Sequence, residues 1–159
     1  MKEAKLNKEH LDKFLSDLRT EDKLEVEVMN CADFSDELFK ASKDKNGFFY
    51  FLLTNDNKPL ALGGAKQLKN PKIAKVWMLC TNELNSNKIE FYKYVQNKIE
   101  FLKIKFDVLY NFIYKSNFSS LNWLKKCGFS ELSLKCMDYK LFYFIKGGVE
   151  FDLRYFTSE

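Results

Sequence analysis

The sequence predicts an α/β fold of the α+β kind: a mixed, mostly antiparallel, twisted sheet of about six to seven strands with helices on both faces. Two observations predict it. Residues 48–54 and 59–66 are strand-like segments on either side of the turn-forming residues 55–57, so together they predict an antiparallel hairpin. Residues 73–126 then follow the order strand, long helix, strand, short helix, and such a crossover places its two strands in parallel.

The first helix is predicted by its cap and by its hydrophobic period. Asn7 is a good N-cap residue, and the apolar residues after it recur at helical spacing: Leu11, Phe14, Leu15 and Leu18. Residues 24–28 alternate apolar and polar side chains, which predicts an extended segment. A second, short helix follows through residues 36–43 and starts at Asp33 or Ser35.

The second half of the chain holds the crossover. Residues 73–81 are largely apolar on both faces, which is typical of a central strand. After a loop at residues 82–87, a long helix is predicted by apolar residues three and four apart: Tyr92, Val95, Ile99, Leu102 and Phe106. Residues 108–114 predict the next strand, and a short helix then starts near Asn117 and ends with Gly128 in the C′ position.

We expect a single domain over residues 1–159. A chain of this length with 46% hydrophobic residues can build a core of normal size. Two more strands, at residues 129–134 and 140–145, complete the sheet. Residues 147–159 are expected to form a C-terminal extension or a last strand.

Composition and charge exclude several classes of partner. The formal net charge is only +4, from 26 basic and 22 acidic residues that are interleaved along the chain. Arginine occurs only at Arg19 and Arg154, so the chain has few guanidinium groups to form bidentate hydrogen bonds with bases and phosphates. A nucleic-acid partner is therefore not expected. The longest apolar runs, residues 48–53 and 141–145, are too short to cross a bilayer, so no membrane association is expected.

The cysteines suggest neither a metal site nor a disulfide framework. Cys31, Cys80, Cys127 and Cys136 show no C-x-x-C spacing, and the single histidine, His10, is far from them in sequence, so no metal site is expected. The chain starts with charged residues and no apolar signal segment. We therefore expect reduced thiols and a soluble protein of the cytoplasm.

Two stretches together resemble the GNAT superfamily of N-acetyltransferases. The first is the strand, loop and long helix over residues 76–106. The second is NFSSLNWLKKCGF, residues 117–129, which looks like the late helix motif of the family: an Asn, a small residue three positions on, and a closing Gly-Phe pair. The order of elements over residues 1–146 is also what that fold implies.

A narrower resemblance is to a GNAT-like group of small podovirus phage proteins, some of which are internal virion or assembly components. The stretches that carry it are LGGA, VWMLCTNEL, YNFIYKSN, WLKKCGF and the closing GVEFDLRYF. This resemblance implies phage or host proteins as partners, and a location in the bacterial host cell or in association with the virion.

The GNAT resemblance implies an acetyl-CoA site. In that family the pantetheine arm runs along the strand before the long helix and bonds to its main chain, and the pyrophosphate lies at the start of the helix. Residues matching these positions are Leu79, Cys80 and Thr81 for pantetheine, Asn85, Ser86, Asn87 and Lys88 for pyrophosphate, and Asn117 and Ser120 on the late helix.

The loop before the long helix departs from the family pattern. It has no glycine and no arginine, and Glu90 stands roughly where a second small residue is expected. A carboxylate repels a pyrophosphate, although Ser86 and Lys88 could still supply donors. The simpler interpretation needs only an N-cap at Asn85 or Ser86 and an acid in the first turn, and under it the cofactor has been lost from this site.

Acetyl transfer to an amine also needs a base and an acid. Glu83, just past the central strand, is the candidate base, and its alternative is an exposed loop carboxylate. The family's usual tyrosine acid falls on Leu124, which cannot donate a proton. Tyr114 on the preceding strand is therefore the candidate acid, with Tyr110 of the same strand as the alternative, and core packing is the other interpretation of both. The acceptor would be a small amine, a protein N-terminus or a lysine.

Two functions remain open from the sequence. One is an acyl-CoA-dependent N-acyltransferase or a CoA-binding relative. The other is a non-catalytic binding or virion-assembly protein on the same scaffold, with Phe151, Tyr155 and Phe156 of the tail as a partner-facing patch or as part of a last strand.

Overall fold

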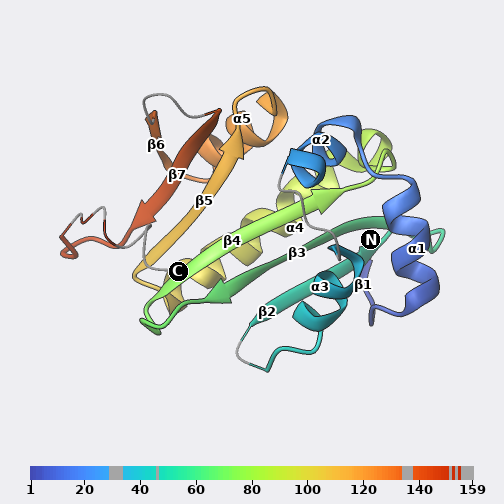
Figure 1. Ribbon diagram of the computed structural model, residues 1–159, viewed down its shortest axis with the longest axis horizontal. Helices are drawn as coiled ribbons and strands as arrows, with labels where there is room; N and C mark the ends of the chain where they lie inside the picture. The colour runs from blue at the N-terminus through green and yellow to red at the C-terminus, as the bar shows by residue number, and fades with distance from the viewer. Residues whose placement is uncertain (29–33, 46, 134–137, 151, 153, 155–159) are drawn as a thin grey trace. The chain divides into compact units, whose positions relative to one another are not determined.

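A computed structural model describes residues 1–28, 34–45, 47–133, 138–150, 152 and 154. The chain divides into two compact units. The first comprises Met1–Gly64 and Trp77–Tyr94, and the second comprises Ala65–Val76 and Val95–Glu159. Figure 1 follows the chain through its elements, three of which, β3, β4 and α4, run through both units.

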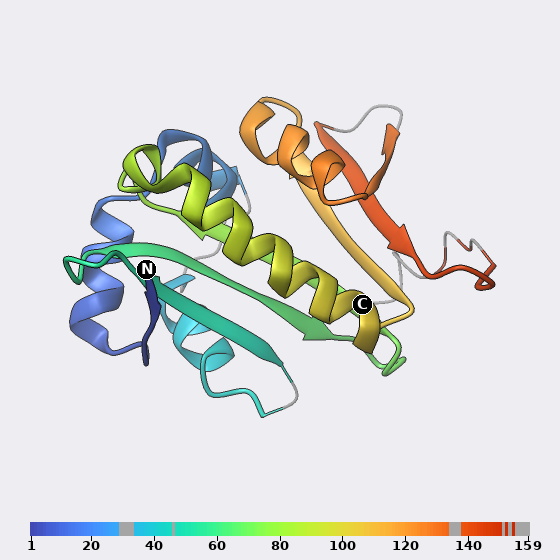
Figure 2. The same ribbon diagram turned by 180° about the vertical axis from the view of Figure 1, so that it is seen from behind.

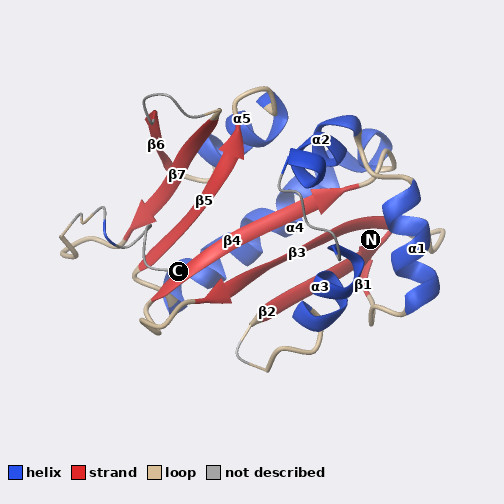
Figure 3. Ribbon diagram, in the orientation of Figure 1, coloured by secondary structure: helices blue, strands red, loops and turns tan. Residues whose placement is uncertain are grey.

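The strands form one mixed sheet with the order β1-β2-β3-β4-β5-β7-β6. Their bounds are β1 Lys2–Glu3, β2 Phe48–Leu53, β3 Pro59–Gln67, β4 Ile73–Cys80, β5 Val108–Tyr114, β6 Ser130–Ser133 and β7 Tyr139–Ile145. β4 and β5 pair in parallel, from Ile73↔Val108 to Lys75↔Tyr110, whereas β1 with β2, β5 with β7, and β6 with β7 are antiparallel. The predicted fold class, a mixed and mostly antiparallel sheet combined with helices, is confirmed (Figure 3).

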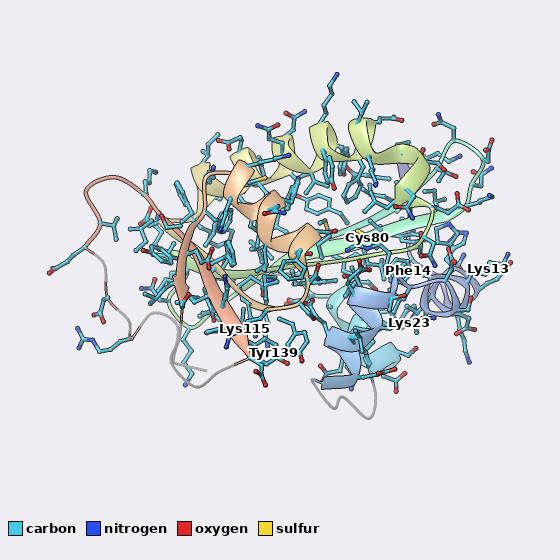
Figure 4. The ribbon with its side chains drawn as sticks, turned by 90° about the horizontal axis from the view of Figure 1, so that it is seen from above. Lys13, Phe14, Lys23, Cys80, Lys115 and Tyr139 are labelled. Carbon is cyan, nitrogen blue, oxygen red and sulfur yellow. The ribbon has the colours of Figure 1, made fainter. Side chains whose placement is uncertain are left out.

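The helices are α1 Lys8–Ser16, α2 Thr20–Val28, α3 Phe34–Ala41, α4 Leu84–Lys105 and α5 Phe118–Lys126. The predicted cap of the first is confirmed, because the backbone N–H of His10 donates to the side chain of Asn7 at 2.8 Å. Within the first unit, the start of α4 lies over one face of the strands and α2 and α3 lie over the other, as Figures 2 and 4 show. Helices on both faces are thus seen in this unit.

Each unit has its own hydrophobic cluster. In the first unit, one buried cluster combines side chains of α1, of Leu18 just after it, of α3 and of the strands: Leu11, Phe14, Leu18, Leu38, Phe51, Leu53, Leu62 and Leu79. In the second unit, the buried cluster comprises Ile73, Val108, Tyr110 and Leu141. Burial of these apolar side chains is the main term that stabilises each unit.

Two sequence predictions of local structure are wrong. The alternation in residues 24–28 predicts an extended segment, but these residues belong to α2, where Asp22 and Val26, four residues apart, turn inward while Leu24 is 42% exposed. The apolar and polar alternation over five residues is too short to separate a strand from one helical turn. Likewise, α4 begins at Leu84, inside the segment predicted as a loop, and the two-residue strand β1 has no sequence signal.

The C-terminal segment is described up to residue 150 and at residues 152 and 154. Of residues 147–159, the described ones at 147–150 include a turn in which Gly148 has a φ of +87°. Phe151, Tyr155 and Phe156, the residues of the predicted partner-facing patch, lie outside the described residues. Gly128 has a φ of +80°, which confirms the predicted glycine at the end of α5.

Gly64 offers a test of how closely β2 and β3 approach. A Cβ at this position would lie 2.1 Å from the backbone oxygen of Phe48, so Gly64→Ala forces the backbone to move. We expect this variant to lose about 1–3 kcal/mol of unfolding free energy in a denaturant titration. Gly147→Ala is the matched control, because no heavy atom of the described residues lies within 4 Å of its added Cβ. Equal stability of the two variants would contradict the observed packing of Gly64.

Candidate functional site

The peptide groups of Cys80, at the end of β4, are already paired within the first unit. The Cys80 N–H donates to the Asp22 carboxylate at 2.8 Å. The Cys80 carbonyl accepts from the N–H of Arg19 at 3.0 Å. Figure 4 labels Cys80 together with Lys23, which marks the helix α2 that supplies Asp22. Cys80 is one of the three residues predicted to bond pantetheine through the main chain. Its N–H and its carbonyl both have partners within its own chain.

Asp22 is a buried charge held by an arginine fork. Its side chain is 0% exposed and accepts from Arg19 Nε at 2.9 Å and from Arg19 Nη2 at 3.0 Å. Burial raises the pKa of the Asp22 carboxyl, and the Arg19 guanidinium and the Cys80 amide oppose this rise. Burial also raises the pKa of the Cys80 thiol well above its ordinary value, so this thiol is a structural group and not a nucleophile.

Leu79 and Thr81 complete the end of the strand. Leu79 packs into the hydrophobic cluster of the first unit. Thr81 is fully buried, with its N–H donating to the carbonyl of Leu60 at 3.0 Å and its hydroxyl to the carbonyl of Pro59 at 2.8 Å. The polar groups of Thr81 thus face β3, the neighbouring strand.

The start of α4 satisfies its own amides. In the turn that enters the helix, three successive N–H groups donate to the carbonyl three residues earlier: Leu84 to Thr81, Asn85 to Asn82 and Ser86 to Glu83. The side chain of Asn87 also donates to the Glu83 carbonyl at 2.9 Å. Asn85, Ser86 and Lys88 have exposed side chains. Few amide donors are left here to bind an anion.

Glu83, the candidate base, lies in an ion pair. Its carboxylate is 2.8 Å from Lys58 Nζ, and it raises the pKa of that lysine. The Glu83 side chain is 28% exposed, so it is neither a free surface carboxylate nor a buried base. As a base it would act with the ammonium group of Lys58 beside it.

Glu90 contacts the first residue of the chain. Its Oε1 is 2.9 Å from the α-ammonium group of Met1, which also donates to the side chain of Asn55. The acid that stands where the family pattern has a small residue therefore has a structural partner. This contact joins the residue before β1 to α4 in the first unit.

The second unit holds the other predicted site residues. Asn117 caps α5, with Oδ1 accepting from the N–H of Ser120 at 3.2 Å, and its own N–H donates to the carbonyl of Tyr114 at 2.9 Å. Asn117 is 1% exposed, and its Nδ2 is a buried donor for which the described residues provide no acceptor. The structure thus brings Tyr114, Asn117 and Ser120 together.

Tyr114, the candidate acid, and the residues Leu124 and Cys127 in and after α5 lie in packed surroundings. The Tyr114 ring meets the Tyr139 ring edge-on, with 5.6 Å between centroids. Leu124, in the position where the family has its tyrosine, is 4% exposed and belongs to the buried face of α5. Burial raises the pKa of the Cys127 thiol to about 11, against the opposing effect of Lys103.

Two further expectations concern metals and membranes. The described residues contain no group of three or more His, Cys, Asp or Glu side chains placed to hold a metal ion. None of the helices in the described part of the chain has the length and hydrophobicity that spanning a bilayer requires. The thiols of Cys80 and Cys127 are free, whereas Cys31 and Cys136 lie outside the described residues.

No family model matches the chain, and no curated protein matches it in sequence. Solved structures do match its fold. A GNAT-family acetyltransferase from Staphylococcus aureus Mu50 matches with a TM-score of 0.64 and 14% identity, over 89% of this chain and 96% of that one. An acetyltransferase from Bacillus subtilis in complex with CoA matches with a TM-score of 0.61 and 15% identity, over 91% of this chain and 96% of that one. Ribosomal-protein-S5-alanine acetyltransferase from Vibrio fischeri matches with a TM-score of 0.56 and 16% identity, over 72% of this chain and 70% of that one. The chain has the fold of the GNAT acetyltransferases.

The residues fit an acyl-CoA ligand poorly in the first unit. Pantetheine would need the Cys80 peptide groups that Asp22 and Arg19 hold, and a pyrophosphate would meet amides that are already paired and the carboxylate of Glu90. The buried Nδ2 of Asn117, in the second unit, has no acceptor among the described residues, and the side chains of Asn85, Ser86 and Lys88 in the first unit are exposed. This arrangement supports no reaction step through the cofactor.

The Arg19 and Asp22 pair is the part of the site that sequence reasoning missed. An Arg and an Asp three residues apart can pair on a helix face, but such pairs are usually exposed. Nothing in the local sequence shows that this aspartate is buried against the main chain of a residue 58 positions away.

Asn117 offers a test that separates its capping role from its unpartnered amide. Asn117→Ala removes the cap of α5 and is expected to cost about 0.5–2 kcal/mol of unfolding free energy. Asn117→Ser keeps an oxygen for the Ser120 amide and removes the buried NH2 group, so it should cost less. Thermal and denaturant unfolding measure both. If the two variants were equally destabilised, the cap would not be the main contribution of Asn117.

Proposed function

We propose that this protein is a GNAT-fold binding protein that does not transfer acyl groups. One observation supports this most strongly: the Asp22 carboxylate, itself held by Arg19, accepts the hydrogen bond of the Cys80 amide. A cofactor arm would have to displace a charged acceptor, and hydrogen bonds to charged groups are stronger than those to neutral ones.

The groups that acyl transfer requires are missing or paired, which also supports a protein that does not transfer acyl groups. Leu124 cannot protonate a leaving thiolate, and the carboxylate of Glu83 is paired with Lys58. The helix start that would hold a pyrophosphate lacks glycine, and Glu90 stands roughly where the family pattern has a second small residue. Each departure weakens binding or catalysis separately, so together they favour a scaffold used for another purpose.

The partner is proposed to be a protein. The resemblance to small podovirus proteins supports an assembly role in a bacterial host cell or in the virion, with phage or host proteins as partners. A fold shared with enzymes does not argue against this role, because function depends on the site and not on the scaffold.

Acyl-CoA-dependent N-acyl transfer is the second candidate, and the buried, unpartnered Nδ2 of Asn117 favours it. In this case Asn117 and Ser120 would help to hold acetyl-CoA, Glu83 would be the base and Tyr114 the acid. The acceptor would be a small amine, a protein N-terminus or a lysine. Among the proteins with this fold, a ribosomal-protein-S5-alanine acetyltransferase illustrates a protein acceptor.

Calorimetry separates the two candidates. We expect no saturable heat when acetyl-CoA or CoA is titrated into the wild-type protein up to about 5 mM, a limit that excludes dissociation constants below about 1 mM. Adenosine diphosphate controls for unspecific nucleotide binding, and a thiol-release assay with amine acceptors runs in parallel. One-to-one binding of acetyl-CoA, or acceptor-dependent thiol release, would overturn the proposal in favour of the transferase.

A further inference from the structure

The Cys80 peptide groups lie on the edge of β4 that faces away from β3. The N–H of the next residue, Thr81, donates to Leu60 on β3, and successive residues of a strand direct their peptide groups to opposite sides. On the Cys80 side, the chain from Leu18 to Asp22 supplies the partners. Leu18 forms an antiparallel bridge with Thr81, and Arg19 donates to the Cys80 carbonyl.

This segment does what an extended, amide-bearing ligand would do at the same edge. Such a ligand adds to a sheet by accepting from a strand N–H and donating to a strand carbonyl, and Asp22 and Arg19 supply that acceptor and that donor. The acceptor here is a carboxylate with a bidentate arginine, and Arg19 has only 11% of its side chain exposed. A neutral ligand could replace the hydrogen bond but would leave a buried charge without its amide partner.

We propose that Arg19 and Asp22 form an autoinhibitory contact, which competes with amide-bearing ligands for the Cys80 peptide group and which pantetheine must displace. This inference deepens the proposed function and rests on it, because it names the contact that excludes the cofactor arm.

The experiment compares ligand binding among four proteins: wild type, Asp22→Asn, Asp22→Ala and Lys23→Gln. Pantetheine is the first probe, because it lacks the phosphates that would meet Glu90, and CoA is the second. Asp22→Asn keeps the size of the side chain and a neutral acceptor, whereas Asp22→Ala removes both the charge and the acceptor. Lys23→Gln is the matched control on the exposed side of α2. Calorimetry gives the affinities, and the backbone amide resonance of Cys80 reports where the ligand binds.

We expect no measurable binding of pantetheine by wild type, measurable binding by Asp22→Asn and the tightest binding by Asp22→Ala, at least about tenfold tighter than the detection limit that wild type fails to reach, because one charge-assisted hydrogen bond no longer competes. The Cys80 resonance should shift with ligand in Asp22→Ala, and Lys23→Gln should behave as wild type. Circular dichroism and thermal unfolding establish that each variant is folded. If Asp22→Ala does not fold, Asp22→Asn decides the question by its own rise in affinity.

Unchanged affinity in a folded Asp22 variant, or binding that leaves the Cys80 resonance in place, would overturn the inference. The proposed function fails by a different result, namely acetyl-CoA binding or acyl transfer by the wild-type protein. Weak binding by wild type that tightens in the variants would retain the autoinhibitory contact and reject the proposed function. Absence of binding in all four proteins would reject the autoinhibitory role of Arg19 and Asp22, and it would leave the proposed function unchanged.

Discussion

The pairing of Cys80 with Asp22 and Arg19 is the interaction on which the character of this site depends. A buried aspartate is unfavourable unless it is paired and hydrogen-bonded, and here the arginine fork and the strand amide supply both conditions. Once the first turn of α2 is held in this way, the end of β4 has a partner within its own chain. The peptide groups of Cys80, which we propose a cofactor arm would need, are then paired within the folded chain.

This contact has a consistent counterpart at the start of α4. The amides that enter the helix bond to their own preceding turn, and Glu90 is paired with the α-ammonium group of Met1. A loop built to hold a pyrophosphate would need glycines and free donors in this region. At both places in the first unit, main-chain groups that could serve a ligand bond instead within the chain. The buried Nδ2 of Asn117 in the second unit has no acceptor among the described residues.

Much of the fold could be predicted from the sequence, because its signals are local. The hairpin around residues 55–57, the caps at Asn7 and Asn117 and the glycine at 128 depend on neighbouring residues alone, and the structure has them where the sequence predicts them. The helix α2 and the burial of Asp22 could not be predicted, because both depend on a contact with β4 that only the tertiary fold creates. The roles of Glu83 and Tyr114 remain predictions for the same reason, since the reactivity of each depends on what surrounds it and not on its place in a motif.

Hydrogen exchange at the backbone amide of Cys80 tests the central claim most directly. If this N–H donates to the buried carboxylate of Asp22, it should be among the slowest amides of the first unit to exchange in wild-type protein, far slower than the amide of Asp56 in the exposed turn between β2 and β3. Exchange of the Cys80 amide as fast as that of Asp56 would mean that the edge of β4 is open to a ligand, and it would contradict the claim that Asp22 closes it.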